Sequence, residues 1–173
     1  METAEILRGK WLKHPLHPIF AHMPVALWPA ALLFDLLSRL KSVGNIMVEL
    51  SFFCIVLGLA SAFLALPTGL TEWSGIKKSN PAWKLALYHM ILNVLVVLLF
   101  LVNFGLRLGT FRTDAEVALA PLILTIFGVV LLFWSGYLGG VMVYDYGVGV
   151  ARYSKSKWRR LAVEGGSNVP KES

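Results

Sequence analysis

Four histidines are the side chains in this sequence best suited to bind a cofactor or a metal ion. His14, His17 and His22 fall close together around two prolines, and His89 follows much later in the chain. Imidazole nitrogens bind haem iron in cytochromes, and they also bind transition-metal ions. The histidines therefore suggest a haem site, a metal site, or a structural role in which the rings only form hydrogen bonds.

The elements that must position these histidines are long and apolar. Of the 173 residues, 57% are hydrophobic and only 15% are charged. Four apolar stretches, at about residues 19–40, 46–66, 83–106 and 117–145, each reach the length of about 20 residues that a helix needs to cross about 30 Å of hydrocarbon. The sequence therefore predicts an all-α integral membrane four-helix bundle.

The same composition excludes several classes of protein. The apolar excess excludes a disordered chain and a nucleic-acid-binding module. The only cysteine, Cys54, leaves no intramolecular disulfide, no cysteine-based zinc site and no covalently attached c-type haem.

The basic residues predict the orientation of the bundle. Residues 1–13 form an N-terminal segment at the membrane surface, residues 14–150 form the membrane domain, and residues 151–173 form a basic tail. The N-terminal segment, the second loop and the tail hold twelve of the sixteen Lys and Arg residues. Short loops rich in Lys and Arg stay in the cytoplasm, so both termini are expected there, in a multi-pass protein of a bacterial inner membrane.

Local signals predict where the helices begin and end. Pro67-Thr68-Gly69 is expected to end the second helix, and Asn80-Pro81 to begin the third. Asp35 and Arg39, four residues apart, predict a local ion pair near the outer surface. Arg107 is expected to anchor its helix at that surface.

The predicted site lies at the cytoplasmic end, where the first and third helices both begin. His22 lies about one turn inside the first helix and His89 about two turns inside the third, so the two rings can share one level. We therefore expect His22 and His89 to be the axial ligands of a haem b, with His17 as the alternate. His14 would contact a propionate, a quinone carbonyl or a phosphate, and Gly136, Gly139 and Gly140 would leave room for the ring.

A metal ion is the alternative occupant of this site. Its ligands would be His17, His22, His89 and Glu72, which carry donors suited to a transition metal. If neither haem nor metal binds, the imidazoles would hydrogen-bond to backbone carbonyls and to Glu72 and hold this end of the bundle together.

Four sequence segments carry a resemblance to a known family: HPLHPIFAHMPVALW at 14–28, GLTEW at 69–73, YHMILN at 88–93 and SGYLGGVMVYDYGVGV at 135–150. Over about residues 11–150 the chain resembles the bacterial four-helix membrane family catalogued as domain of unknown function 2231. The resemblance implies four transmembrane helices. It also implies a link to electron transfer, because relatives occur beside or fused to redox modules. Many relatives have His at the position of Tyr146, so this chain lacks one ligand that a second haem would use.

The function expected from these features is that of a small b-type cytochrome or a quinone-linked electron-transfer subunit. The alternatives are a non-catalytic accessory subunit and a protein that binds or transports a divalent metal. An electron-transfer or accessory subunit fits better than a stand-alone enzyme. The expected partners are the lipid bilayer, a quinone or redox protein, and other copies or subunits of a membrane complex.

Overall fold

The computed structural model describes residues 3–12, 14–40, 45–150 and 155–167, and within these residues it contains helices and no strands. The helices are α1 (Thr3–Leu7), the 3-10 turn η1 (Lys10–Leu12), α2 (Leu16–Leu37), α3 (Ile46–Ser74), α4 (Ala82–Arg107), α5 (Leu119–Tyr144) and α6 (Lys155–Glu164). Four of them, α2 to α5, are long and apolar enough to cross a membrane, which confirms the predicted four-helix membrane fold.

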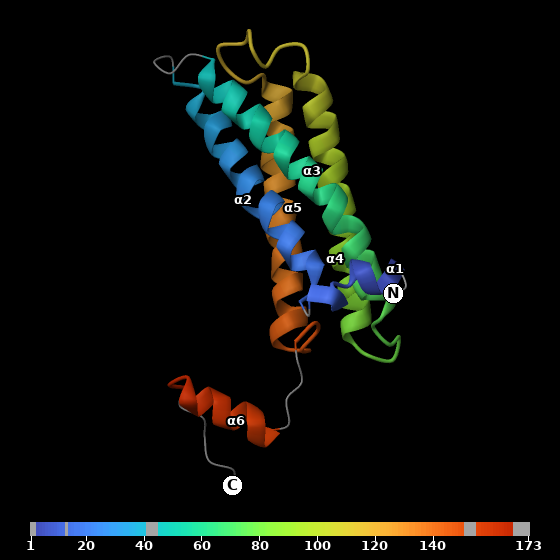
Figure 1. The fold of residues 1–173 in the computed structure, drawn as a ribbon. Helices are drawn as coiled ribbons and strands as arrows, with labels where there is room; N and C mark the ends of the chain where they lie inside the picture. Colours follow the sequence, from blue (N-terminus) through green and yellow to red (C-terminus); the bar gives the residue numbers. More distant parts are fainter. Residues whose placement is uncertain (1–2, 13, 41–44, 151–154, 168–173) are drawn as a thin grey trace.

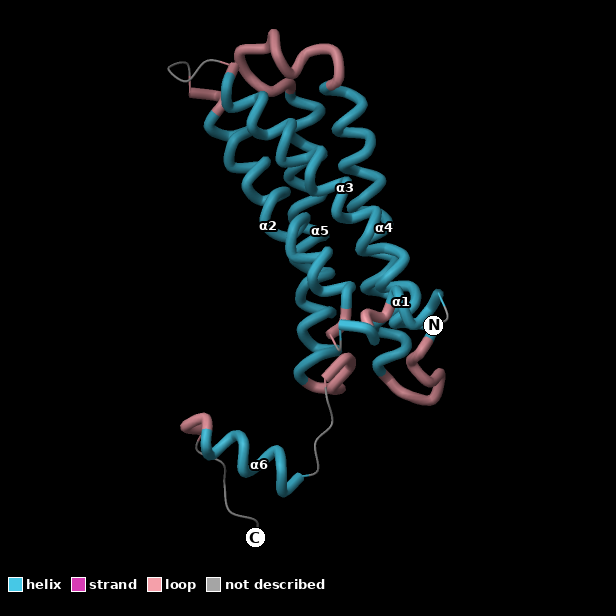
Figure 2. The backbone as a smooth tube through the Cα atoms, viewed as in Figure 1, coloured by secondary structure: helices cyan, strands magenta, loops and turns pink. Residues whose placement is uncertain are grey.

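The four long helices run up and down in an elongated bundle (Figure 1). α2 packs mainly on α3, and α4 packs mainly on α5, while the α3–α4 and α2–α5 contacts complete the ring. α2 and α4 are therefore parallel and diagonally opposed. The end where α2 and α4 begin, which also carries α1, is called the histidine end below; the loops after α2 and α4 lie at the opposite end (Figure 2).

The prediction that Pro67 ends the second helix is wrong, because α3 continues to Ser74 with Pro67 inside it. A proline removes one backbone N–H and leaves carbonyls of the preceding turn without a partner. Here Pro67 leaves the Phe63 carbonyl without its helical N–H donor, and the Thr68 hydroxyl supports the same turn by donating to the Leu64 carbonyl oxygen at 3.1 Å and to that of Ala65 at 2.8 Å. Such side-chain donors allow proline inside membrane helices.

Pro24 inside α2 is accommodated by a donor from the neighbouring helix. The proline leaves the Phe20 carbonyl without its helical N–H donor, and Ser61 of α3 donates its hydroxyl to that oxygen at 2.8 Å. The repair also links α2 to α3. By contrast, the predicted start of the third helix is confirmed, because Asn80 Oδ1 accepts the Ala82 N–H at 2.9 Å.

The centre of the bundle is a dry core built around two stacked rings. Trp28 of α2 and Phe100 of α4 stack with centroids 4.1 Å apart. Each ring lies against a glycine of the partner helix: a Cβ on Gly58 would come within 2.3 Å of Trp28, and one on Gly128 within 2.6 Å of Phe100. These two glycines are therefore required for the diagonal helices to meet across the axis.

The two halves of the bundle form an internal repeat. Residues of α2 meet the residues of α4 that lie 72 positions later, and their positions define an axis along the bundle: His17 with His89, Trp28 with Phe100, and Asp35 with Arg107. In α3 and α5 the offset is 70, which relates Gly58 to Gly128 and Gly69 to Gly139. Parallel repeats of this kind have an axis along the membrane normal.

Candidate functional site

The histidine end brings His17 and His89 together across the axis of the repeat. Their ring centroids lie 6.3 Å apart and the ring planes are nearly perpendicular, at 85°. Both side chains are half-buried. The structure therefore joins one histidine from each half of the molecule at one level of the bundle.

His89 is held by hydrogen bonds to Ser135 and Asn93. Its Nδ1 lies 2.8 Å from the Ser135 carbonyl oxygen, which can only accept, so this nitrogen carries the proton and donates. Its Nε2 then accepts the Asn93 amide N–H at 3.0 Å. Asn93 also donates to the Ser135 hydroxyl at 2.7 Å, which ties α4 to α5.

His17 is held in the corresponding way by α3. Its Nδ1 donates to the Ala65 carbonyl oxygen at 2.9 Å. In both halves of the repeat a glycine four residues after the accepting carbonyl lies against the ring: a Cβ on Gly69 would be 2.8 Å from His17, and one on Gly139 would be 3.3 Å from His89. The two imidazoles thus occupy equivalent sockets, each made of one carbonyl and one glycine.

The structure does not pair His22 with His89 as expected from helix depth. His22 lies on the exposed face of α2, where its Nδ1 contacts the Pro18 carbonyl of its own helix. Five residues separate it from His17, which is about one turn and a further 140° at 3.6 residues per turn. The two histidines therefore face in different directions, and the alternate, His17, takes the place opposite His89.

Of the three glycines expected to leave room for a ring, only Gly139 lies against the site. Gly136 and Gly140 have no neighbouring atom within 4 Å of where a Cβ would stand. In the described structure both therefore face away from other helices, and the packing predicted for them is not present. The prediction placed all three glycines at the site, whereas in the structure only the position of Gly139 is directed at a histidine ring.

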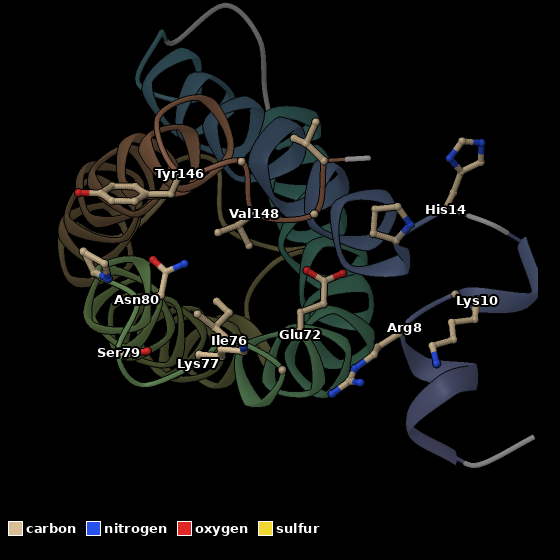
Figure 3. A pocket seen from close by; sticks show the side chains of 17 residues that line it. Arg8, Lys10, His14, Glu72, Ile76, Lys77, Ser79, Asn80, Tyr146 and Val148 are labelled. Carbon is tan, nitrogen blue, oxygen red and sulfur yellow. The ribbon is translucent and has the colours of Figure 1, made fainter. Parts of the chain in front are cut away.

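Beside the histidine pair the bundle opens into a pocket of about 1110 Å³. Figure 3 shows Glu72 pointing into the middle of the bundle end, with Arg8 and Lys77 on the same side of the bundle and the His14 ring directed outward. Glu72 Oε1 is buried and has no hydrogen-bond partner in the described structure. Glu72 also lies within electrostatic range of His17 and Arg8. The pocket thus holds a carboxylate that the protein itself leaves incompletely paired.

The segment after α5 forms one wall of this pocket. The Gly147 and Val148 N–H groups donate to the carbonyls of Val143 and Met142, which caps the end of α5. Gly147 and Gly149 have φ values of 63° and 74°, in the left-handed region that favours glycine. The GVGV motif therefore turns the chain across the bundle end, where Val148 lies in Figure 3.

The four ligands expected for a metal ion are not assembled in this structure. Among the residues that it describes, no group of three or more His, Cys, Asp and Glu side chains is placed to hold an ion. Glu72 and His17 are near each other, but His22 lies on the exposed face of α2.

The opposite end holds a second polar network that sequence reasoning did not predict. The Arg107 guanidinium donates to both carboxylate oxygens of Asp35, each at 2.7 Å, and the two side chains are 2% and 0% exposed. Ser51, Asn103 and Thr125 add hydrogen bonds to this pair. The repeat in the sequence could have predicted this pair. Asp35 lies seven residues after Trp28, and Arg107 lies seven residues after Phe100.

The expected Asp35–Arg39 pair is therefore wrong. Arg39 instead donates to the Val117 carbonyl oxygen at 2.9 Å and lies 3.8 Å from the exposed Glu116. Arg107 is likewise a buried partner of Asp35 and not a surface anchor. Asn93 and Asn103 each bridge α4 to α5, as expected for amides inside a membrane bundle.

Comparison with known proteins identifies the family. A family model described as "predicted membrane protein (DUF2231)" matches residues 13–152, which covers the four long helices and the segment after α5. No curated protein and no solved structure matches the chain. By this match, which spans most of its length, the chain belongs to the DUF2231 family of predicted membrane proteins.

Proposed function

We propose that this protein is a small electron-transfer subunit of the membrane that binds a haem b, with His17 and His89 as the axial ligands. The observation that carries the proposal is the pair of equivalent imidazoles on the axis of the repeat. Two imidazoles from facing helices of a bundle are a recognised way to hold a haem.

The hydrogen bonds of the two rings fit this role. Histidines that bind a metal usually donate their other ring N–H to a carbonyl or carboxylate, which fixes the ring and raises its basicity. His17 and His89 both donate from Nδ1 to a backbone carbonyl. This leaves Nε2 of each ring as the nitrogen for a metal.

The spacing of the rings also fits. Two imidazoles that share one iron have centroids about 6 Å apart, since each metal–nitrogen bond is about 2 Å long. The observed separation is 6.3 Å. Ligation by His89 would displace the Asn93 amide from Nε2, and Asn93 would keep the His89 carbonyl and the Ser135 hydroxyl as partners.

A bound haem would supply one-electron chemistry, and the protein would supply ligation, shielding and orientation. Ala65 and Ser135 orient the two imidazoles through their carbonyl oxygens. The stacked Trp28 and Phe100 fill the axis on the inner side of the site, and the pocket around Glu72 lies nearer the end of the bundle. An electron donor or acceptor would therefore meet the site at the histidine end.

We place the histidine end in the cytoplasm. Twelve Lys and Arg residues lie in the segments at this end, and of the four assigned to the other side Arg107 is buried in an ion pair. The positive-inside rule counts loop charges, so the bias is twelve to three. A C-terminal alkaline phosphatase fusion should be inactive, and a strongly active fusion would reverse the orientation.

The test of haem binding is the absorption spectrum of the purified protein after expression with adequate haem supply. We expect a Soret band, and a reduced-minus-oxidised spectrum typical of two histidine ligands. His17→Ala and His89→Ala should each abolish or change this spectrum, because each removes one proposed ligand. His22→Ala is the matched control and should leave it unchanged, since His22 lies on the exposed face of α2.

Two results would overturn the proposal. One is wild-type protein without a Soret band, and the other is a spectrum that depends on His22 and not on His17. In the first case, metal analysis of the same sample separates the remaining functions. Stoichiometric iron, copper or zinc would favour the metal-binding protein, and its absence would favour an accessory subunit in which the imidazoles only hold the helices together.

A further inference from the structure

We infer that the pocket at the histidine end binds the headgroup of an ethanolamine phospholipid, with its ammonium group at Glu72 and its phosphate among the basic residues of the rim. Neither His17 nor His89 lines this pocket. The inference therefore does not rest on the proposed haem, and the two can fail separately.

The carboxylate of Glu72 would be stabilised by a cationic hydrogen-bond donor. A buried carboxylate oxygen without a partner is costly, and a charge-assisted N–H bond removes most of that cost. Glu72 Oε1 is buried and unpaired in the described structure, while the Glu72 side chain lines the pocket. Arg8 does not fill this role through the bonds it makes, because its Nε and Nη2 donate to the Thr71 carbonyl oxygen.

The rim of the pocket carries basic side chains that could bind an anion. Lys77 and Arg8 bring positive charge to the lining, and His14 is exposed beside them. Lys10 also lines the pocket, although its ammonium is paired with Glu5 at 2.6 Å. Lys and Arg side chains are the usual ligands of phosphate oxygens. A carboxylate inside and cations at the rim thus match a ligand that carries an ammonium group beyond a phosphate.

The position of the pocket favours a lipid over a soluble phosphate ester. It opens where four helices that can cross a membrane reach their ends, which is the level of the headgroups. The adjoining N-terminal segment exposes Ile6, Trp11 and Leu12, and exposed apolar and aromatic side chains of this kind sit at membrane interfaces. An acyl chain attached to the headgroup could then lie along the apolar outer face of the bundle.

The binding test compares three phospholipids with the same acyl chains and different headgroup nitrogens. These are phosphatidylethanolamine, its N,N-dimethyl derivative and phosphatidylcholine, added to the delipidated protein in detergent and counted by native mass spectrometry. Phosphatidylethanolamine should bind about tenfold more tightly than phosphatidylcholine, with the dimethyl lipid between them, because the number of N–H donors falls from three to none. Equal binding of all three would overturn the inference, with no variant needed.

Two variants locate the site. Glu72→Gln keeps the size of the side chain and removes its charge, so the preference for ethanolamine should disappear. Lys77→Gln should weaken the binding of all three lipids to the same degree, because each carries the same phosphate. Glu116→Gln is the matched control, since Glu116 is exposed at the opposite end, and it should change nothing. An ethanolamine preference that survives Glu72→Gln would place the headgroup elsewhere and overturn the assignment.

A further arm separates the lipid from a soluble source of the same chemistry. Free phosphoethanolamine at millimolar concentration should not displace the bound lipid, because it lacks the acyl chains that lie on the bundle. If it displaces the lipid at micromolar concentration, the ligand is a soluble phosphate ester and the lipid assignment is wrong. The Soret band of the Glu72→Gln protein, measured in parallel, reports on the haem site independently.

Discussion

The two ends of the bundle solve the problem of polar groups at membrane depth in opposite ways. At the opposite end, Asp35 and Arg107 form a fully buried ion pair whose charges are matched by Ser51, Asn103 and Thr125. At the histidine end, hydrogen bonds to backbone carbonyls hold His17 and His89, and beside them lies a pocket that contains the unpaired Glu72 oxygen. A network in which every polar group has a partner stabilises the fold, whereas one that leaves a hydrogen-bond acceptor unpaired can bind a ligand.

The two ends can be compared directly, because at each end the repeat pairs one residue of α2 with the equivalent residue of α4. Asp35 and Arg107 occupy equivalent positions in α2 and α4, as His17 and His89 do. Where the two halves carry opposite charges, the axis is closed by an ion pair. Where they carry the same residue, each ring donates from Nδ1 to a carbonyl oxygen of the neighbouring helix, and the two rings meet at the axis. We therefore expect substitutions at the opposite end to affect stability, and substitutions at the histidine end to affect binding.

The largest expected effect is that of Arg107→Met. It removes one partner of a buried pair and leaves the Asp35 carboxylate uncompensated, which typically costs about 3–5 kcal/mol. The melting temperature of the variant in detergent should fall sharply, and the yield of folded protein should drop. A melting temperature equal to that of the wild type would show that this network does not stabilise the bundle.

A double variant distinguishes the ion pair from its individual charges. Asp35→Leu combined with Arg107→Met removes both charges at once, and such replacements are often neutral or stabilising. We expect the double variant to recover most of the stability lost in Arg107→Met. Arg112→Met, at an exposed loop position, serves as the control for loss of an arginine.

The next largest loss of stability is expected when a glycine that faces the axis is replaced, and not when a glycine that faces away from it is replaced. Gly58→Leu would drive a side chain into Trp28, and overpacking of this kind costs about 1–3 kcal/mol or more. Gly136→Leu meets no neighbouring atom within 4 Å and should leave the monomer as stable as the wild type. Thermal unfolding of the two variants side by side checks the assignment, and equal destabilisation would contradict it.

These outcomes show what the sequence alone could predict. The four spans follow from length and hydropathy, and the start of α4 follows from Asn80-Pro81, because both signals are local. The partners of Asp35 and His89 are not local: they lie on the diagonally opposed helix, and helical depth alone does not say which face points to the axis. Pro67-Thr68-Gly69 misled because the same three residues are typical of a turn, whereas here the Thr68 hydroxyl donates to carbonyl oxygens of its own helix and α3 continues to Ser74.

The evidence for the diagonal pairing was nevertheless present in the sequence as a repeat. His17 is followed after eleven residues by Trp28 and after seven more by Asp35, and His89 is followed at the same distances by Phe100 and Arg107. The pattern is difficult to recognise because, of these three pairs on the axis, only the histidines are identical. The other two pairs, Trp28 with Phe100 and Asp35 with Arg107, make contacts across the axis but consist of different residue types, so a comparison of the two halves by sequence identity misses them.

Asn93→Leu tests the histidine end with a smaller effect on stability. It removes the donor to His89 Nε2 and to the Ser135 hydroxyl, so a loss of about 1 kcal/mol is expected from the hydrogen bonds. The same change frees Nε2 for a metal, so haem binding should be retained or become tighter. A haem titration of the apoprotein measures this, and loss of binding would mean that Asn93 positions His89 for its ligand.

The smallest effect is expected for Glu116→Gln at the surface of the opposite end. Glu116 and Arg39 lie 3.8 Å apart and both are exposed, and such pairs contribute about 0–1 kcal/mol because water screens them. Arg39 also keeps its hydrogen bond to the Val117 carbonyl oxygen when Glu116 is replaced. The melting temperature should therefore match that of the wild type within error, at low and at high salt. A clear, salt-dependent loss would mean that the exposed pair, and not only Asp35–Arg107, stabilises this end of the bundle.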